Sequence, residues 1–525
     1  GGRHSRVSLT RPPVRRTADA GGCVIVPPTL SARTKLGIEI VAFGAAGGVI
    51  GDALLRAMPW GLNVAIGTAG LVGAGVWLVR RHRVTPGPDA AWLAITALLL
   101  GAAFVRRDAA ALARFDMLAL VGALAFAAAS LQGERITRWS VIDYVRAGVT
   151  ATIASIVGGL VLIGRDIDWR EMPREGRLRQ LRGVIAGVLI AAPLLAIFAA
   201  LFASADEVFA NVLQNLFAFD PASIVTHTFF ICFWGALTAG LLRWSLIGRP
   251  VPGPQMEHIP SNVTPFAVAL GLLNALFLLF VVVQLRYFFG GAALVAQTGG
   301  LTYAAYARRG FFELVTASGL VLPVLLGVDF LARGGTSPQI RTIRQFSGVL
   351  LMLLTVVMAS ALERMRLYVS AYGLSTTRLY ATAFMVFLIG VFAWFGWTVL
   401  RGNRQRFAFG ALMQGLAMLA GLHLLNPDAF ILETNLNRPA AERPFDAHYA
   451  LTLGGDAVPP LLAALPQLGS EDRCVIAHGL LARWNRQDAD WRTWNWSRAR
   501  ARTLVRTQAD ALKASCPIKP KEPAQ

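Results

Sequence analysis

Two segments of the sequence place acidic and basic side chains directly beside long apolar runs. In one, Arg309 and Glu313 are spaced i,i+4, and in the other Glu363 and Arg366 are spaced i,i+3. Either spacing puts the two side chains on one face of a helix. An ionisable group inside the apolar part of a membrane costs about 2.5–3.5 kcal/mol or more, so such groups mark candidate sites. A carboxylate there can act as a general base, ligate a metal ion or pair with an arginine.

The second segment, SALERMRLYVSAYGLSTTRLY, joins two apolar runs over residues 360–380. On a helix that continues the preceding run, Arg364, Tyr368 and Tyr372 form a row at i, i+4 and i+8. Tyrosines of this kind gather at the membrane interface. The segment is therefore either an interfacial anchor or a site.

The end of this segment contains the residues that terminate one helix and start another. Gly373 can close the first helix in a left-handed conformation. Ser375 or Thr376 can then cap the helix that follows. The spacing predicts a helix end, a turn and a helix start at the interface.

The first segment, GGAALVAQTGGLTYAAYARRGFFE, covers residues 290–313 and is too polar for an ordinary lipid-facing helix. It either re-enters the membrane against protein or lies at the surface. Its Arg308, Arg309 and Glu313 share one helical face. An interfacial anchor and a site are equally compatible with this pattern.

The sequence lacks the usual motifs of several reaction classes. It contains no G-x-x-x-x-G-K-[ST], H-E-x-x-H, C-x-x-C or G-x-S-x-G, which removes the usual signatures of ATP-driven transport, zinc hydrolysis and lipase chemistry. We expect no metal and no cofactor. His227 and His423 are expected to be packed or interfacial. Five acids near predicted helix ends are expected to be solvated by the interface: Glu39, Asp52, Asp116, Asp143 and Asp329.

The composition is that of a membrane protein. The 525 residues are 55% hydrophobic and 15% charged, with a mean hydropathy of +0.53, whereas soluble domains are about 25% charged. The apolar residues form blocks close to the ~20 residues of a spanning helix. The sequence predicts an all-α, polytopic helical bundle of about 11–13 spanning helices with a small soluble helical C-terminal domain.

The net charge of +20 does not indicate nucleic-acid binding. Lysine occurs only at Lys35, Lys513, Lys519 and Lys521, so 46 of the 50 basic residues are arginines scattered among short loops. Such arginines hold loops in the cytoplasm and favour anionic lipid head groups. The expected partner is the lipid bilayer, with no nucleic acid.

Twelve apolar blocks are candidate spans. They are Leu36–Leu55, Trp60–Val79, Ala90–Val105, Phe115–Leu131, Tyr144–Ile163, Val184–Ala203, Ile224–Leu242, Thr264–Leu285, Phe312–Phe330, Phe346–Ala361, Leu379–Leu400 and Phe407–Leu425. The first contains Gly44-xxx-Gly48 and Gly47-xxx-Gly51, a spacing that permits close helix contact.

Arginine placement predicts the topology only in part. The acidic loop 204–223 is assigned to the outside, and the arginine-rich loops 331–345 and 401–406 then fall inside. Loops 80–89 and 106–114 are both basic, although a span between them would separate them. A cytoplasmic N-terminus requires eleven or thirteen spans, and the short Ala90–Val105 block is the one expected not to cross fully.

The chain divides into three predicted parts. Residues 1–35 form a disordered basic arm, residues 36–425 the bundle, and residues 426–525 a soluble helical domain outside the cytoplasm. The last part holds Cys474 and Cys516. In an oxidising periplasm the two either form a disulfide or are unrelated cysteines.

Three segments carry a resemblance to known proteins. ERMRLYVSAYGLSTTRLY, LTYAAYARRGFFELV and NPDAFILETNLNR…FDAHYALTLGGDAVPPLLAAL resemble the motifs of a bacterial membrane-protein family, domain of unknown function 4173, which is related to family 4153. The resemblance covers roughly residues 180–500 and implies a polytopic helical protein of the bacterial inner membrane. It assigns no catalytic role to any residue.

If the topology holds, the three segments can meet on one extracytoplasmic surface. The residues of this candidate patch are Tyr306, Arg308, Arg309, Glu313, Glu363, Arg364, Tyr368, Tyr372, Arg378, Asn435, Arg438, Asp446 and Asp456. The expected role is binding or scaffolding in the cell envelope. The alternatives are a secondary transporter of a small molecule, or a membrane enzyme that acts on a lipid-linked substrate with Glu313 or Glu363 as base or metal ligand.

Overall fold

The computed structural model describes residues 30–171, 221–248, 263–289, 311–438, 445–486 and 490–516, with 187, 191, 194, 195, 198, 199, 201–207 and 209 between them. The described residues form helices and turns and contain no strand, which confirms the all-α fold class. Two compact units are present: Gly1–Lys35 with Ile167–Ala218, and Leu36–Asp166 with Phe219–Gln525. All interactions described below lie within the second, which we call the main unit.

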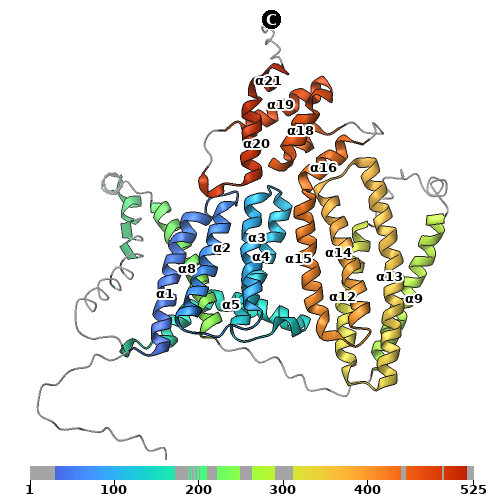
Figure 1. The fold of residues 1–525 in the computed structure, drawn as a ribbon, viewed down its shortest axis with the longest axis horizontal. Coiled ribbons are helices and arrows are strands. Elements are labelled where there is room, and N and C mark those ends of the chain that lie inside the picture. Colours follow the sequence, from blue (N-terminus) through green and yellow to red (C-terminus); the bar gives the residue numbers. More distant parts are fainter. Residues whose placement is uncertain are drawn as a thin grey trace, which may run out of the picture. The chain divides into compact units, whose positions relative to one another are not determined.

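Long apolar helices make up most of the main unit (Figure 1). They are α1 (Ala32–Leu55), α2 (Leu62–Arg81), α3 (Ala90–Arg106), α4 (Ala110–Leu131), α5 (Val141–Val161), α8 (Pro221–Leu246), α9 (Thr264–Phe289), α12 (Phe311–Leu331), α13 (Ser337–Tyr372), α14 (Thr376–Thr398) and α15 (Phe407–Leu425). Ten helices in the described part of the chain are long and apolar enough to cross a membrane, and α3 is a shorter apolar helix. The chain is a multi-pass membrane protein.

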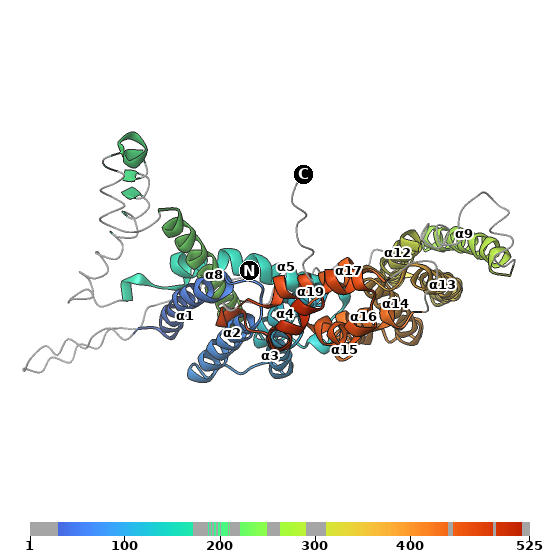
Figure 2. The ribbon, with the colours of Figure 1, turned by 90° about the horizontal axis from the view of Figure 1, so that it is seen from above.

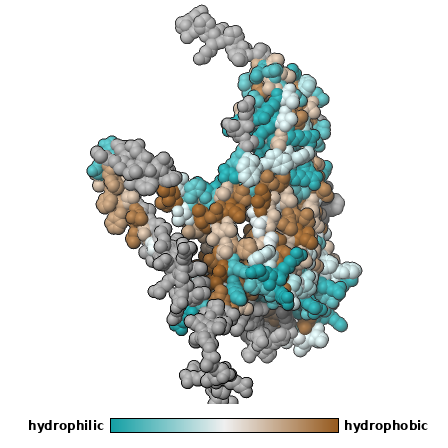
Figure 3. All heavy atoms as spheres, turned by 60° about the vertical axis from the view of Figure 1, so that its left-hand side comes forward, coloured by the Kyte–Doolittle hydropathy of each residue, from teal (hydrophilic) through white to brown (hydrophobic). Residues whose placement is uncertain are grey.

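Among the residues described after α15, six short helices lie together at one end of the bundle (Figure 1). They are α16 (Pro427–Leu436), α17 (Ala447–Thr452), α18 (Val458–Ala464), α19 (Ser470–Trp484), α20 (Trp496–Thr507) and α21 (Ala509–Ala514). We call this end of the bundle the C-domain end and the opposite end the distal end. Figure 3 shows a band of hydrophobic surface over the bundle, with hydrophilic surface above it on the C-terminal helices.

The short helices share a hydrophobic core that extends into the bundle. Ile431 of α16, Ile476 of α19 and Val505 of α20 are fully buried in it. Leu374 and Leu379, from the turn between α13 and α14 and the start of α14, belong to the same cluster. Viewed from above, α16, α17 and α19 lie over the long helices (Figure 2).

Helix α5 begins and ends at the distal end of the bundle. Near its start, the Tyr144 hydroxyl donates to the Ile136 carbonyl in the α4–α5 connection at 2.9 Å. Just beyond its end, Asp166 pairs with Arg243 in the last turn of α8 at 2.5 Å. Figure 1 shows α5 lying across this end. The chain therefore does not cross the bundle on α5, although the helix has the length and hydropathy of a span.

The expectation that Ala90–Val105 does not cross fully stays a prediction, because the block is shorter than the ten candidate spans of the described residues. This block is α3, which packs along α2 and α4 and connects the distal end to the C-domain end. Its 17 residues span about 26 Å, close to the ~30 Å hydrocarbon core.

Glycines bring α1 and α8 into backbone contact. A Cβ atom on Gly48 would lie 2.4 Å from the Ile231 carbonyl oxygen, and one on Gly44 would lie 2.7 Å from the Ala239 Cβ. No larger residue fits at either position without moving the helices apart. The close contact that this glycine spacing permits is present in the structure, with α8 as the partner.

The other predicted spans correspond to helices, with ends that differ by several residues. The largest difference is α13, one continuous helix of 36 residues where the block Phe346–Ala361 was predicted. The predicted block Val184–Ala203 and the arm 1–35 lie largely outside the described residues. The division into arm, bundle and C-terminal domain remains a prediction.

Candidate functional site

The turn between α13 and α14 is built as its sequence predicts, with one difference. Gly373 ends α13 and the Ser375 hydroxyl caps α14 by accepting from the Arg378 backbone N–H. Gly373 has φ +79° and ψ 172°, so its φ is positive but its ψ is extended rather than helical. This region of backbone space is essentially restricted to glycine.

The side chain of Asn435 holds this turn against α16. Its Oδ1 accepts from the Leu374 N–H at 2.7 Å, and its Nδ2 donates to the Leu374 carbonyl at 2.8 Å. A Cβ on Gly373 would lie 2.7 Å from Asn435 Oδ1, so the glycine is also required by the close approach of Asn435.

Arg378 closes the turn from the bundle side. Its guanidinium donates to the carbonyls of Tyr372, at 3.1 Å, and Gly373. The same group lies 4.1 Å from the ring centre of Tyr368, where the cation is attracted to the face of the ring. The tyrosine row predicted on α13 therefore contacts Arg378, which belongs to the next helix, α14.

Helix α17 completes the arrangement. The Asp446 carboxylate caps it by accepting from the Tyr449 N–H at 2.8 Å. The Tyr449 hydroxyl accepts in turn from the Thr376 N–H in the first turn of α14, at 2.8 Å. The C-terminal helices are thus tied to the start of α14 by backbone and side-chain hydrogen bonds.

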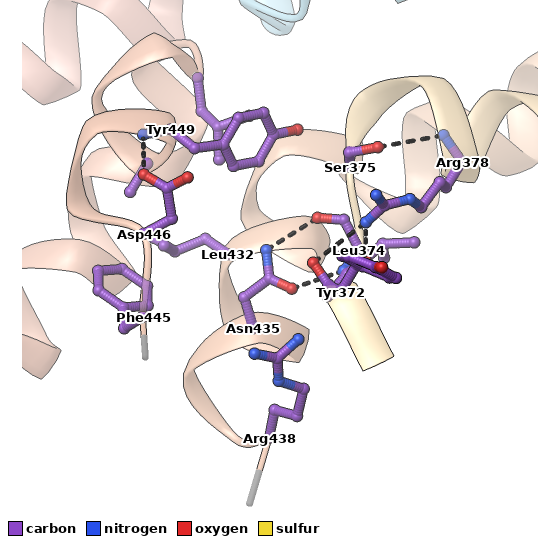
Figure 4. A pocket seen from close by; sticks show the side chains of 13 residues that line it. Tyr372, Leu374, Ser375, Arg378, Leu432, Asn435, Arg438, Phe445, Asp446 and Tyr449 are labelled. Atoms are coloured by element: carbon purple, nitrogen blue, oxygen red, sulfur yellow. Dashed lines mark hydrogen bonds between the residues drawn. The ribbon is translucent and has the colours of Figure 1, made fainter. Parts of the chain in front are cut away.

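A cavity of about 180 Å³ lies between these elements (Figure 4). Its wall from the bundle includes Tyr372, Ser375 and Arg378, and its wall from the C-terminal helices includes Asn435, Arg438, Phe445, Asp446 and Tyr449. Two guanidinium groups, one carboxylate and aromatic rings therefore line a space large enough for a small molecule. We call it the turn pocket.

The turn pocket contains part of the predicted patch. Tyr372, Arg378, Asn435, Arg438 and Asp446 line it, and Tyr368 supports it through Arg378. Tyr306, Arg308 and Arg309 lie outside the described residues.

The remaining patch residues lie elsewhere. Glu363 pairs with Arg366 at 2.7 Å, and the Arg364 guanidinium donates to Gln284 on α9 at 2.8 Å. Glu313 is exposed in the first turn of α12 and does not line the pocket. Of these four residues, which were predicted to gather at one patch, Asp446 lines the pocket, whereas Glu313, Glu363 and Arg364 do not.

Asp456 belongs to a second polar cluster, which ties the C-terminal helices to the α3–α4 connection. Its Oδ1 accepts from the Arg107 guanidinium at 3.0 Å and its Oδ2 from the Asp108 N–H at 2.9 Å. The Asp108 carboxylate accepts from the Gly455 N–H at 2.9 Å and from the Arg498 guanidinium at 2.6 Å. We call this cluster the docking lock.

Two further buried polar side chains lie beside the docking lock. Asn495, 1% exposed, donates to the carbonyls of Phe104 and Arg107 at 2.7 and 2.9 Å. Asp428, 5% exposed, accepts from the Gly454 N–H at 2.7 Å. Burial raises the pKa of Asp428 to about 6, and that hydrogen bond opposes the rise.

Sequence reasoning missed most of the docking lock. Arg107 and Asp456 are 349 residues apart, and Arg498 and Asp108 are 390 apart, so no local spacing connects them. The one available signal was the pair of basic loops on either side of α3, which conflicted with the predicted topology. In the structure, Arg107 of the second of these loops is paired with Asp456.

Two acids that were expected to be solvated are instead buried and paired with histidines. Asp116, 2% exposed, lies 2.9 Å from His423 Nε2, and Asp52, 6% exposed, lies 2.5 Å from His227 Nδ1. The solvation expected for these two acids is wrong because a second helix covers each of them. Their ion pairs join α4 to α15 and α1 to α8.

Cys474 and Cys516 are joined as a disulfide in the structure, with Cα atoms 5.0 Å apart. The bond links α19 to Cys516, two residues beyond the end of α21. His478 lies one turn after Cys474, so these three side chains also form a group with metal-ligand spacing. The disulfide accounts for both thiols.

Comparison with known proteins gives one match. The family model described as Domain of unknown function (DUF4153) matches residues 94–464, which include the whole of the turn pocket and much of the docking lock. No curated protein and no solved structure matches the chain. The resemblance had pointed to family 4173, which this match does not show; the matching model is that of the related family 4153. The chain belongs to the DUF4153 family of domains of unknown function.

Proposed function

We propose that the protein is a binding and scaffolding protein of the bacterial inner membrane, which presents the turn pocket at its extracytoplasmic face. One observation carries the proposal. The bundle and the C-terminal helices each supply a cation to the same cavity, Arg378 from one and Arg438 from the other. A small anionic molecule fits such a cavity, because its wall holds two guanidinium groups and aromatic rings against the single carboxylate of Asp446.

The distribution of arginines supports the orientation. Connections at the distal end carry Arg80, Arg81, Arg83, Arg135, Arg138, Arg401, Arg404 and Arg406. Short connections at the C-domain end carry Arg56, Arg106 and Arg107, of which the last is paired with Asp456. Cytoplasmic loops are the ones enriched in arginine, so the distal end is assigned to the cytoplasm. The disulfide agrees, because such bonds persist in oxidising compartments.

The two alternative functions have less support. A transporter of a polar solute needs a polar pathway at mid-depth, and the larger cavity of about 550 Å³ is lined by apolar side chains apart from Thr96 and Tyr380. A lipid-linked enzyme that uses Glu363 needs that carboxylate available, but it forms two hydrogen bonds with Arg366. Binding at the turn pocket requires neither.

Thermal unfolding of the full chain in lipid nanodiscs tests the proposal. Inorganic phosphate, glycerol phosphate and succinate serve as anionic probes, and a probe at 100 times its Kd stabilises the folded state by about 2.7 kcal/mol. Arg438→Gln removes one cation from the pocket, and Arg500→Gln removes an exposed arginine of α20 as the matched control. We expect at least one probe to raise the Tm of the wild type and the control but not of Arg438→Gln. A shift that is equal in all three, or absent with every probe, contradicts the proposal.

A further inference from the structure

A long apolar groove runs along the outside of the bundle between α4 and the pair α14–α15. Its volume is about 550 Å³. Phe115, Leu118 and Phe384 form its rim with exposed fractions of 49, 72 and 45%. These helices cross the membrane, so the rim faces lipid chains. The groove is distinct from the turn pocket and takes no part in the proposed function.

The dimensions of the groove are those of one acyl chain. On α15 it extends from Ala411 to Leu422, and on α4 from Phe115 to Phe126. Eleven residues of helix correspond to about 16 Å. One leaflet contributes about half of the ~30 Å hydrocarbon core, or about 15 Å. The groove therefore has the length that a single chain of one leaflet occupies.

Small residues on facing helices give the groove its depth. A Cβ atom on Gly122 would meet only Phe126, at 3.7 Å, and one on Gly415 would meet only Phe387, at 3.9 Å. Both distances are ordinary van der Waals contacts, so a larger side chain at either position would extend into the groove rather than into a packed neighbour.

The end of the groove nearest the C-terminal helices carries a cation. Arg114 is exposed and lies one helical turn before Leu118, on the face of α4 that lines the groove. Tyr380 closes the same end, with its ring stacked on Phe115 at 5.6 Å. The nearby Asp116 is buried and lies within hydrogen-bond distance of His423, away from the groove lining.

We propose that the groove binds an anionic phospholipid, with one acyl chain in the groove and the phosphate at Arg114. Chain length and head-group charge both agree with this occupant. Because an arginine near the membrane surface favours anionic lipid by roughly 1 kcal/mol, we expect about a fivefold preference for phosphatidylglycerol over phosphatidylcholine with the same chains.

Native mass spectrometry of the full chain, titrated with each of these two lipids, tests the proposal. Gly415→Leu fills the groove, and Gly421→Leu on the same helix, where nothing lies within 4 Å of an added Cβ, is the matched control. We expect Gly415→Leu to weaken binding of both lipids at least tenfold and the control to bind as the wild type does. If Gly415→Leu does not fold, Gly122→Leu fills the groove from the facing helix.

The head group is tested separately. We expect Arg114→Gln to reduce the preference for phosphatidylglycerol to less than twofold, whereas Arg135→Gln, which removes an exposed arginine at the distal end, preserves it. The proposal is overturned if the wild type binds the two lipids equally, if the groove-filling variants bind both as the wild type does, or if Arg135→Gln removes the preference as Arg114→Gln does.

Discussion

Arg498 is the residue whose loss should release the C-terminal helices from the bundle. It is 6% exposed, and its guanidinium donates to Asp108 at 2.6 Å, to the Thr493 carbonyl at 2.7 Å and to the Trp60 carbonyl at 2.9 Å. Arg498→Met keeps most of the side-chain volume and removes every donor. Asp108 then remains in a largely buried position with its charge uncompensated.

The expected cost follows from that uncompensated charge. Removal of one partner of a buried ion pair destabilises a protein by about 3–5 kcal/mol, more than the pair itself contributes. Asp108 keeps the hydrogen bond from Gly455, which places the estimate near the lower end, at about 3 kcal/mol. This free energy is that of docking, because the pair joins the α3–α4 connection to α20.

Hydrogen exchange of the full chain in nanodiscs measures this quantity. If α20 opens by undocking, a loss of about 3 kcal/mol speeds exchange of its protected amides roughly 100-fold. Arg500→Met is the control, because Arg500 is exposed on the same helix and surface substitutions stay within about 0.5 kcal/mol. Amides in α13 should exchange at the wild-type rate in both variants.

A double variant separates the ion pair from the packing. Asp108→Asn removes the charge that Arg498→Met leaves behind, so the combined variant should be less destabilised than the sum of the two single variants, by about 1–3 kcal/mol. Exchange in α20 that stays within tenfold of the wild type in Arg498→Met would refute the reasoning. The hydrophobic core beneath α16–α20 would then hold the C-terminal helices without the docking lock.

Three further predictions concern single residues. Gly373→Ala should lower stability by about 2–3 kcal/mol, because the backbone conformation of Gly373 is glycine-specific and a Cβ there meets Asn435. The control Gly348→Ala, within α13, should be neutral or slightly stabilising. Equal Tm values for the two variants would contradict this prediction. Burial raises the pKa of Asp428 from 3.8 to about 6. Between these two pH values the folded state therefore binds more protons than the unfolded state. The free energy of unfolding should then fall by about 3 kcal/mol as the pH rises from 3.8 to about 6. Asp428→Asn should flatten this part of the Tm–pH curve, and an unchanged curve would assign the dependence to other groups. Gly48→Val should separate α1 from α8 and lower the Tm by several degrees, while Gly70→Val, with open space around it, should not.

The turn between α13 and α14 could be predicted because its determinants are local. Gly373 and Ser375 act through their own backbone and the next few residues, so the sequence is enough to locate a helix end and a helix start. The ψ angle of Gly373 could not be predicted in the same way. It depends on Asn435, which reaches the turn from 61 residues away in sequence.

The ion pairs within the bundle could not be predicted because they depend on which helices are neighbours. Asp116 and His423 each looked like an isolated residue near a helix end, and only the contact of α4 with α15 makes them a pair. The same limitation affected α5. Its hydropathy is that of a spanning helix, and only the contacts of Tyr144 and Asp166 show that both of its ends lie at one end of the bundle.

The position of the turn pocket connects ligand binding to the docking of the C-terminal helices on the bundle. The turn pocket has one wall from α13 and α14 and one from α16 and α17, so it exists only while the C-terminal helices are docked. A ligand that binds only the docked state stabilises docking by RT ln(1 + [L]/Kd), and docking raises the affinity for the ligand by the same linkage. The docking lock adjoins the pocket, because Leu453 of the pocket wall directly precedes Gly454 and Gly455, so its loss must weaken ligand binding. An Arg498→Met variant that undocks and still binds a pocket ligand with wild-type affinity would place the ligand elsewhere.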